Sequence, residues 1–79
     1  MERERLIKLV ADNALAHLRY DARNPDVGMG MLPQTAVELA EKDILEEAAR
    51  WNSLAALSLN FEDIRDDVLL TVLKDTTWR

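Results

Sequence analysis

Every proline and glycine of this 79-residue chain lies in one stretch, residues 23–34, which therefore holds all of its strong helix breakers. The stretch reads Arg-Asn-Pro-Asp-Val-Gly-Met-Gly-Met-Leu-Pro-Gln. Because proline and glycine are the residues least compatible with a helix interior, the long segments on either side are free to be helical. A connection of this length in a small domain is either a binding loop or a flap on the core, and its four apolar side chains argue against a plain solvated linker.

The first segment has the periodicity of an amphipathic helix. Its apolar residues recur every three or four positions, the spacing that gathers side chains on one helix face. The predicted face consists of Leu6, Ile7, Val10, Ala14, Leu18 and Ala22. Asn24-Pro25 should stop this helix, because the residue before a proline disfavours the helical conformation. The sequence therefore predicts a helix over 2–22 and a loop over 23–34.

A second helix is predicted over 36–57. Thr35 and Glu38 have the spacing of a capping box, which marks a helix start. The predicted core stripe is Val37, Ala40, Ile44, Ala48, Trp51 and Ala55, with Glu38, Glu41, Lys42, Glu46 and Arg50 facing water. Asn52-Ser53 could end this helix and cap another, but each residue costs only a few tenths of a kcal/mol inside a helix, so continuity is favoured.

A third helix is predicted over 61–74, followed by a short tail over 75–79. Asn60 is a suitable N-cap, and Leu59 and Ile64 occupy the hydrophobic-staple positions around it. The predicted buried face is Phe61, Ile64, Val68, Leu69, Val72 and Leu73, with Asp63, Arg65, Asp66, Asp67 and Lys74 solvated. No alternating apolar run predicts a strand. The expected fold is a single all-α domain, residues 1–79, formed by a three-helix bundle with a long loop and roughly antiparallel neighbours.

Composition narrows the class of protein. A hydrophobic fraction of 48% with 32% charged residues is typical of a globular chain, and no apolar run approaches the roughly 18 residues of a membrane span. The amino terminus lacks the apolar region of a secretory signal, and the chain has no cysteine for disulfides, thiol catalysis or cysteine-ligated metal sites. We expect a cytoplasmic protein without membrane contact.

Charge is distributed unevenly around a net value of −5. Residues 1–23 carry five bases and four acids, whereas residues 24–79 carry five bases and eleven acids. This asymmetry favours packing of the first segment against the acidic remainder, within one chain or across a dimer. It argues against a direct nucleic-acid interface, which needs a broad basic surface.

The residues that could carry chemistry do not form a catalytic or metal-binding pattern. His17 is the only histidine, and Asp21, one helical turn later, is its predicted partner. The acidic groups lack the Glu-x-x-His motif of di-iron bundles and the spacing of a calcium loop. Gly-Met-Gly lacks the lysine and hydroxyl positions of a phosphate loop. We therefore predict no enzyme activity, no cofactor and no metal.

Three groups of residues are candidates for contact with a partner. The loop supplies Met29, Met31 and Leu32, which could instead form a flap over the core; the aromatic candidates are Tyr20 and Trp78; the acidic candidates are Glu62, Asp63, Asp66 and Asp67. The acids could equally be a solvated helix face. Trp78, next to the terminus, must dock on its own chain or be buried by another. Because the second helix should be longer than the third, part of its stripe is left uncovered, which favours a homodimer.

These features favour a small protein-interaction module that acts as an adaptor, regulator or inhibitor. Small acidic helical proteins of this kind are common products of phages and mobile elements, where they dock on a larger host protein or nucleic-acid-binding complex. The alternative is a nucleic-acid-associated regulatory subunit that contacts phosphate through the basic residues of the first helix, Arg3, Arg5, Lys8, Arg19 and Arg23. An enzyme using His17 and a carboxylate is a third hypothesis.

Overall fold

The computed structural model describes residues 3–24, 30–50 and 60–78, and these residues form three helices and no strand. The helices are α1 (Arg3–Arg23), α2 (Pro33–Arg50) and α4 (Arg65–Lys74), and a short 3₁₀ turn, η1 (Phe61–Asp63), leads into α4. The all-α prediction is confirmed for the described parts of the chain. Met29, Trp51, Asn52-Ser53 and Leu59 lie outside them, so the predictions made for these positions stay untested.

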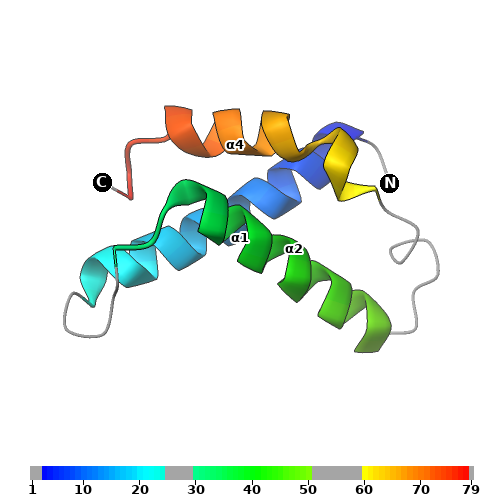
Figure 1. Cartoon of the computed structure of the whole chain (residues 1–79), viewed down its shortest axis with the longest axis horizontal. Helices are drawn as coiled ribbons and strands as arrows, with labels where there is room; N and C mark the ends of the chain where they lie inside the picture. Colours follow the sequence, from blue (N-terminus) through cyan, green and yellow to red (C-terminus); the bar gives the residue numbers. More distant parts are fainter. Residues whose placement is uncertain (1–2, 25–29, 51–59, 79) are drawn as a thin grey trace.

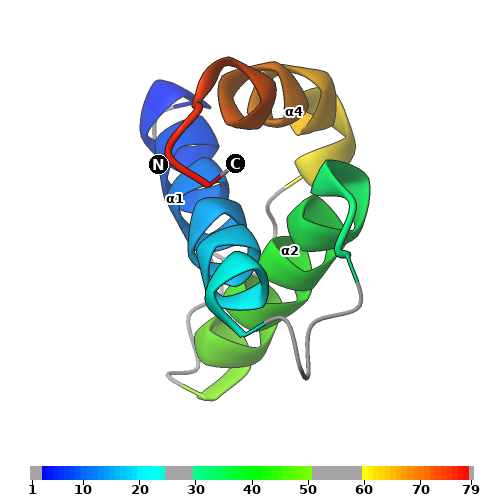
Figure 2. The same cartoon turned by 90° about the vertical axis from the view of Figure 1, so that its left-hand side faces the viewer.

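The three helices surround a common core, with α1 as the element that both others pack against. In Figure 1, α2 and α4 run in opposite directions, as predicted, whereas α1 crosses α2 obliquely. Figure 2 shows the same helices from one end, with α4 at the top, α1 on the left and α2 below it on the right. The three helices therefore form a bundle in which α2 and α4 run roughly antiparallel and α1 crosses α2 obliquely.

Buried side chains from all three helices and η1 form one cluster. Its members are Leu6, Val10, Ala11, Ala14, Leu15, Leu18, Ala36, Val37, Ala40, Phe61, Ile64, Val68 and Val72. The face predicted for α1 was partly wrong, because Ala11 and Leu15 are buried while Ala22 is exposed. A helix that contacts two neighbours buries a wider face than a single stripe, and this explains the two additional positions.

The connection between α1 and α2 ends earlier than predicted, because α2 begins at Pro33. Asn24 stops α1 as expected, since its backbone and side-chain amides both donate to the carbonyl oxygen of Tyr20, at 3.1 and 2.8 Å. Gly30 has a φ of 68°, in the left-handed region that glycine adopts readily. The Asn24 hydrogen bonds thus end α1, and Gly30 supplies a left-handed backbone conformation shortly before α2.

The predicted start of the second helix was wrong. The helix begins at Pro33, and the Ala36 amide donates to the Leu32 carbonyl at 3.1 Å to close its first turn. Thr35 is therefore inside the helix and is not its N-cap residue. Proline suits the first helical position because its φ is already helical and its missing N–H would have no partner there.

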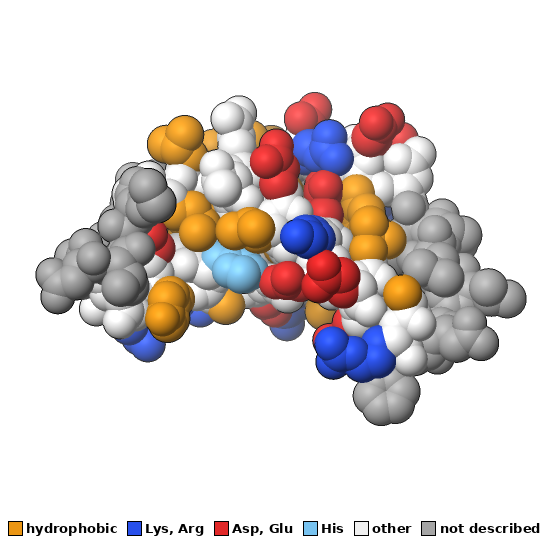
Figure 3. Space-filling model, turned by 60° about the horizontal axis from the view of Figure 1, so that its bottom comes forward, with side chains coloured by type: hydrophobic (Ala, Val, Ile, Leu, Met, Phe, Trp, Pro, Cys, Tyr) orange, Lys and Arg blue, Asp and Glu red, His pale blue; other side chains and the backbone are white. Residues whose placement is uncertain are grey.

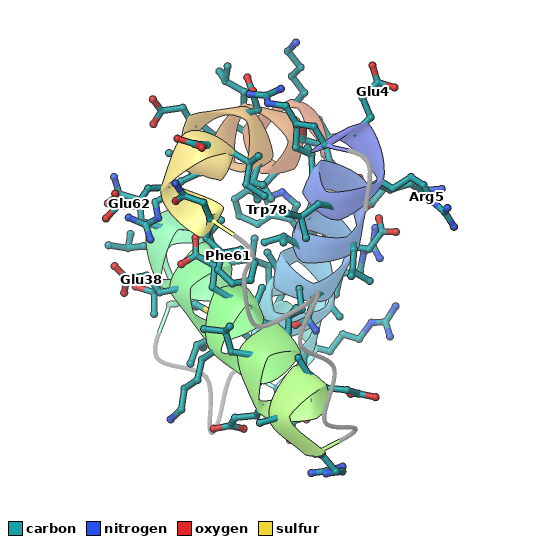
Figure 4. All side chains as sticks on the ribbon, turned by 90° about the vertical axis from the view of Figure 1, so that its right-hand side faces the viewer. Glu4, Arg5, Glu38, Phe61, Glu62 and Trp78 are labelled. Atoms are coloured by element: carbon teal, nitrogen blue, oxygen red, sulfur yellow. The ribbon has the colours of Figure 1, made fainter. Side chains whose placement is uncertain are left out.

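Asn60 caps the start of η1 as predicted. Its side-chain oxygen accepts from the Glu62 amide at 3.1 Å, and its backbone is extended. The Ile64 amide then bonds the Phe61 carbonyl, and regular α-helix resumes at Arg65. The predicted continuous helix over 61–74 is thus a 3₁₀ turn followed by α4. Figure 4 shows Phe61 pointing into the space between the helices.

The carboxyl-terminal tail folds back onto its own chain. The Trp78 indole is partly buried against the core, and its Nε1–H donates to the Val72 carbonyl at 3.1 Å (Figure 4). That carbonyl belongs to the last turn of α4 and also accepts from the backbone amide of Asp75 at 3.2 Å. Of the two outcomes predicted for Trp78, docking on its own chain is the one observed.

None of the helices in the described ranges has both the length and the apolar character that crossing a bilayer requires.

The carboxylate of Asp75 holds the turn that leads to Trp78. It accepts from the amide and hydroxyl of Thr77, at 2.8 and 2.6 Å, and these hydrogen bonds lower the pKa of Asp75 below its ordinary value. A carboxylate with a lowered pKa stabilises the fold fully at pH values above the pKa of its unfolded state, about 3.9. This stabilisation is lost as the pH falls through the lower pKa of the folded state. Docking of the tail should therefore weaken only in strongly acidic solution.

We predict that Asp75→Asn shifts the emission of Trp78 to longer wavelength at neutral pH, in a Trp51→Phe background where Trp78 is the only fluorophore of its kind. The same shift should appear in the Trp51→Phe protein without the Asp75 substitution, but only when the pH falls through the lowered folded pKa of Asp75, which lies below its ordinary value of about 3.9. Thr76→Ala, a neighbouring exposed change, is the control and should leave the emission unchanged. Identical spectra for parent and Asp75→Asn at pH 7 would contradict this account of the tail.

Candidate docking cleft between α2 and α4

An open cleft of about 280 Å³ lies where α2 and α4 meet. Its lining comes from Gln34, Val37 and Glu38 of α2 and from Arg65, Asp66 and Leu69 of α4. Val37 is buried and Leu69 partly buried, so they give the cleft an apolar base, while the polar side chains of the lining are exposed. The cleft is amphipathic, with acids at its rim.

A bidentate ion pair closes the α2–α4 contact beside this cleft. The Arg65 guanidinium donates from Nε to Oε1 of Glu41 and from Nη2 to Oε2, both at 3.0 Å. The Glu41 side chain is only 12% exposed, whereas that of Arg65 is 48% exposed. A paired fork of this kind fixes orientation as well as charge, so it holds the two helices in register.

Both members of this pair were predicted to face water, and for Glu41 that prediction was wrong. Glu41 lies four residues after Val37 and three before Ile44, so it occupies the buried stripe of α2. A charged residue at such a position needs a partner, and that requirement was the available signal. The partner could not be read from the sequence, because Arg65 lies on another helix.

The electrostatic surroundings of Arg65 are acidic. The hydrogen-bonded Glu41 carboxylate raises the pKa of Arg65, and this effect is larger than the lowering of the pKa by burial. The nearby carboxylates of Glu62 and Glu38 raise the pKa by smaller amounts. Figure 4 shows Glu38 and Glu62 projecting from the same side of the molecule, one from α2 and one from η1. One arginine, already neutralised by Glu41, thus lies among additional carboxylates.

His17 forms a second polar contact between helices, which joins α1 to α2. Its Nε2 lies 2.7 Å from Oδ2 of Asp43, and both side chains are partly exposed. The predicted hydrogen-bond partner, Asp21, instead accepts from the Met31 amide at 3.1 Å and so anchors the connection to α1. Figure 3 shows the histidine in pale blue at the surface, beside hydrophobic and acidic side chains. Among residues 3–24, 30–50 and 60–78, no group of three or more potential ligands is placed to hold a metal ion.

Two of the five bases in the first segment are engaged with the chain itself. Arg3 bonds the Asp67 carboxylate and the Asp63 carbonyl, and Arg19 bonds the Thr77 hydroxyl with Asp75 nearby. The predicted attraction between the first segment and the acidic remainder therefore operates within one chain. Arg5 and Lys8 are exposed, and Figure 4 shows Arg5 pointing away from the core.

The predicted contact residues do not gather at one site. Tyr20 and Leu32 are 65% and 63% exposed, whereas Met31 and Trp78 pack against the core. Asp67 is paired with Arg3, and the remaining acidic candidates, Glu62, Asp63 and Asp66, are exposed. Among the contact candidates that the structure describes, Asp66 alone lines the cleft. Gln34, Val37, Glu38, Arg65 and Leu69, which complete its lining, were not among the predicted contact residues.

The chain matches no protein-family model, and comparisons with curated proteins and with solved structures found no match. Function must therefore be inferred from the residues and geometry of the chain itself.

The Glu41–Arg65 pair predicts an asymmetric response to mutation. Arg65→Met should lower the free energy of unfolding by about 2–3 kcal/mol, because it leaves a nearly buried carboxylate without its partner. Glu41→Met should cost about 1 kcal/mol or less, because water solvates the exposed guanidinium that remains. Urea denaturation measures both values.

Lys42→Met is the matched control, since it removes a base from an exposed i,i+4 pair with Glu46 at 4.0 Å. That variant should stay within about 0.5 kcal/mol of the parent. An effect of Glu41→Met equal to that of Arg65→Met would show that the burial of the carboxylate does not determine the energetics of the pair.

Proposed function

We propose that this protein is a non-enzymatic interaction module, a small adaptor, regulator or inhibitor that docks on a larger protein through the α2–α4 edge. The observation that carries the proposal is a group of three leucines on α4, Leu69, Leu70 and Leu73. Leu69 lines the cleft, and Leu70 and Leu73 are 53% and 41% exposed. Leu69 and Leu73 are one helical turn apart and so extend the apolar base of the cleft along the helix.

Contact with a partner would remove this apolar surface from water. Full burial of a leucine side chain contributes about 1.5–3 kcal/mol, so completing the burial of two half-exposed leucines is a substantial part of a binding free energy. Single exposed leucines are ordinary on protein surfaces, but neighbours along one helix beside an amphipathic cleft are a better basis for an interface.

The nucleic-acid alternative has less support from the geometry. It relied on five basic residues of the first helix, of which Arg3 and Arg19 are engaged with acidic and hydroxyl groups of the same chain. Binding phosphate through either would require breaking these contacts. Homodimerisation stays a prediction, and the docking of Trp78 on its own chain removes one of the reasons for it.

The proposal is tested by affinity capture from the native host with wild-type protein and with Leu70→Ser/Leu73→Ser, followed by binding measurements with the purified captured protein. We expect a stoichiometric protein partner whose affinity falls at least tenfold in the double variant. Leu9→Ser, which alters a leucine of α1 that is 44% exposed, is the control and should bind like wild type.

The opposite outcome is equally measurable. Direct binding of DNA or RNA that weakens steeply with salt, without any stable protein partner, would replace the proposal with the nucleic-acid alternative.

A further inference from the structure

The size of the α2–α4 cleft indicates what kind of group it can receive. Pockets that enclose small molecules measure about 300–1,000 Å³ and bury most of the ligand. This cleft is open and measures about 280 Å³. It therefore suits one or two anchoring side chains from a larger partner better than an enclosed cofactor or substrate.

The charge of the cleft determines whether that partner should be basic or acidic. Glu38 and Asp66 line it, and Glu62 lies close enough to act on Arg65. Arg65, the one cation among the described residues of the lining, is neutralised by its two bonds to Glu41. The rim therefore carries a net negative charge, which attracts a basic partner and repels acidic proteins and phosphates. A second copy of the chain is disfavoured, because each copy carries a net charge of −5.

The backbone around the cleft selects the conformation of the partner. Both walls are helices, whose interior N–H and C=O groups bond within each helix and offer no strand edge to an extended peptide. Contact must therefore be made by side chains. One apolar side chain packed on Leu69 and a second packed one turn further along α4, on Leu73, would have the spacing of positions i and i+4 on a helix.

From this geometry we infer that the α2–α4 cleft binds a basic amphipathic helix of the partner protein. Apolar side chains of that helix pack on Leu69 and Leu73, and its lysine or arginine side chains pair with Glu38 and Asp66. This inference rests on the proposed function and adds the chemical class of the partner.

The test is a selection of binders to the full-length protein from a displayed library of randomised helical peptides, followed by titration of the enriched peptides as synthetic, labelled probes. We expect enriched sequences with apolar residues at i and i+4 flanked by lysine or arginine. Amide chemical shifts should change most around residues 34–38 and 65–69.

A charge-matched pair of variants makes the test specific. Glu38→Lys/Asp66→Lys should weaken the selected peptides at least tenfold, whereas Glu46→Lys/Glu47→Lys, which makes the same charge change at exposed positions of α2 outside the cleft lining, should retain binding within about twofold. Circular dichroism and urea denaturation verify that both variants fold. Equal losses in the two variants would show that only net charge matters and would overturn the inference.

The remaining outcomes also decide the matter. Enrichment of acidic or non-helical peptides, no enrichment at all, or shifts confined to other surfaces would overturn the inference. If a captured protein partner nevertheless binds wild type and binds Glu38→Lys/Asp66→Lys equally well, the proposed function stands and only its assignment to this cleft fails. Dimers that dissociate on Glu38→Lys/Asp66→Lys would assign the cleft to a second copy instead.

Discussion

Burial of one wide face of α1 is the interaction on which the rest of the structure depends. Leu6, Val10 and Leu18 supply apolar area on this face, and the small side chains of Ala11 and Ala14 allow close approach of another helix. Both α2 and α4 pack on this face. A chain of 79 residues buries only about 60–65% of the surface of its unfolded form, so it has enough apolar surface for one small core. The shared face of α1 is the platform on which α2 and α4 form that core.

The cleft is a consequence of this arrangement. In Figures 1 and 2, α2 and α4 each lie against α1 and cross it in different directions, and residues of α2 and α4 line the cleft where the two helices meet. The Glu41–Arg65 pair joins the two helices there, and beside it the buried Val37 and the partly buried Leu69 form the base of an acidic opening. The same packing that stabilises the core therefore produces the surface to which we assign binding.

Helical periodicity predicted the parts of this structure that depend on one element at a time. The 3–4 spacing of Phe61, Ile64, Val68 and Val72 identified side chains that are buried, whereas Leu73, predicted for the same buried face, is 41% exposed, so that part of the prediction was wrong. It failed where two signals competed, as at the start of α2, where Pro33 prevailed over the Thr35–Glu38 pattern. It also failed where a partner came from another helix. Neighbouring positions on one helix suggested Asp21 for His17, whereas the observed Asp43 depends on how α1 crosses α2, as the cleft depends on how α2 meets α4.

The role of α1 as a shared platform is tested most directly by native-state hydrogen exchange of the wild type and of Val10→Ala, which truncates a fully buried side chain of α1. Loss of this side chain should lower the opening free energy of protected amides by about 2 kcal/mol, and by the same amount in α1, α2 and α4. Retention of full protection at Val68 and Val72 of α4, while the α1 amides lose theirs, would contradict the dependence of α4 on this platform.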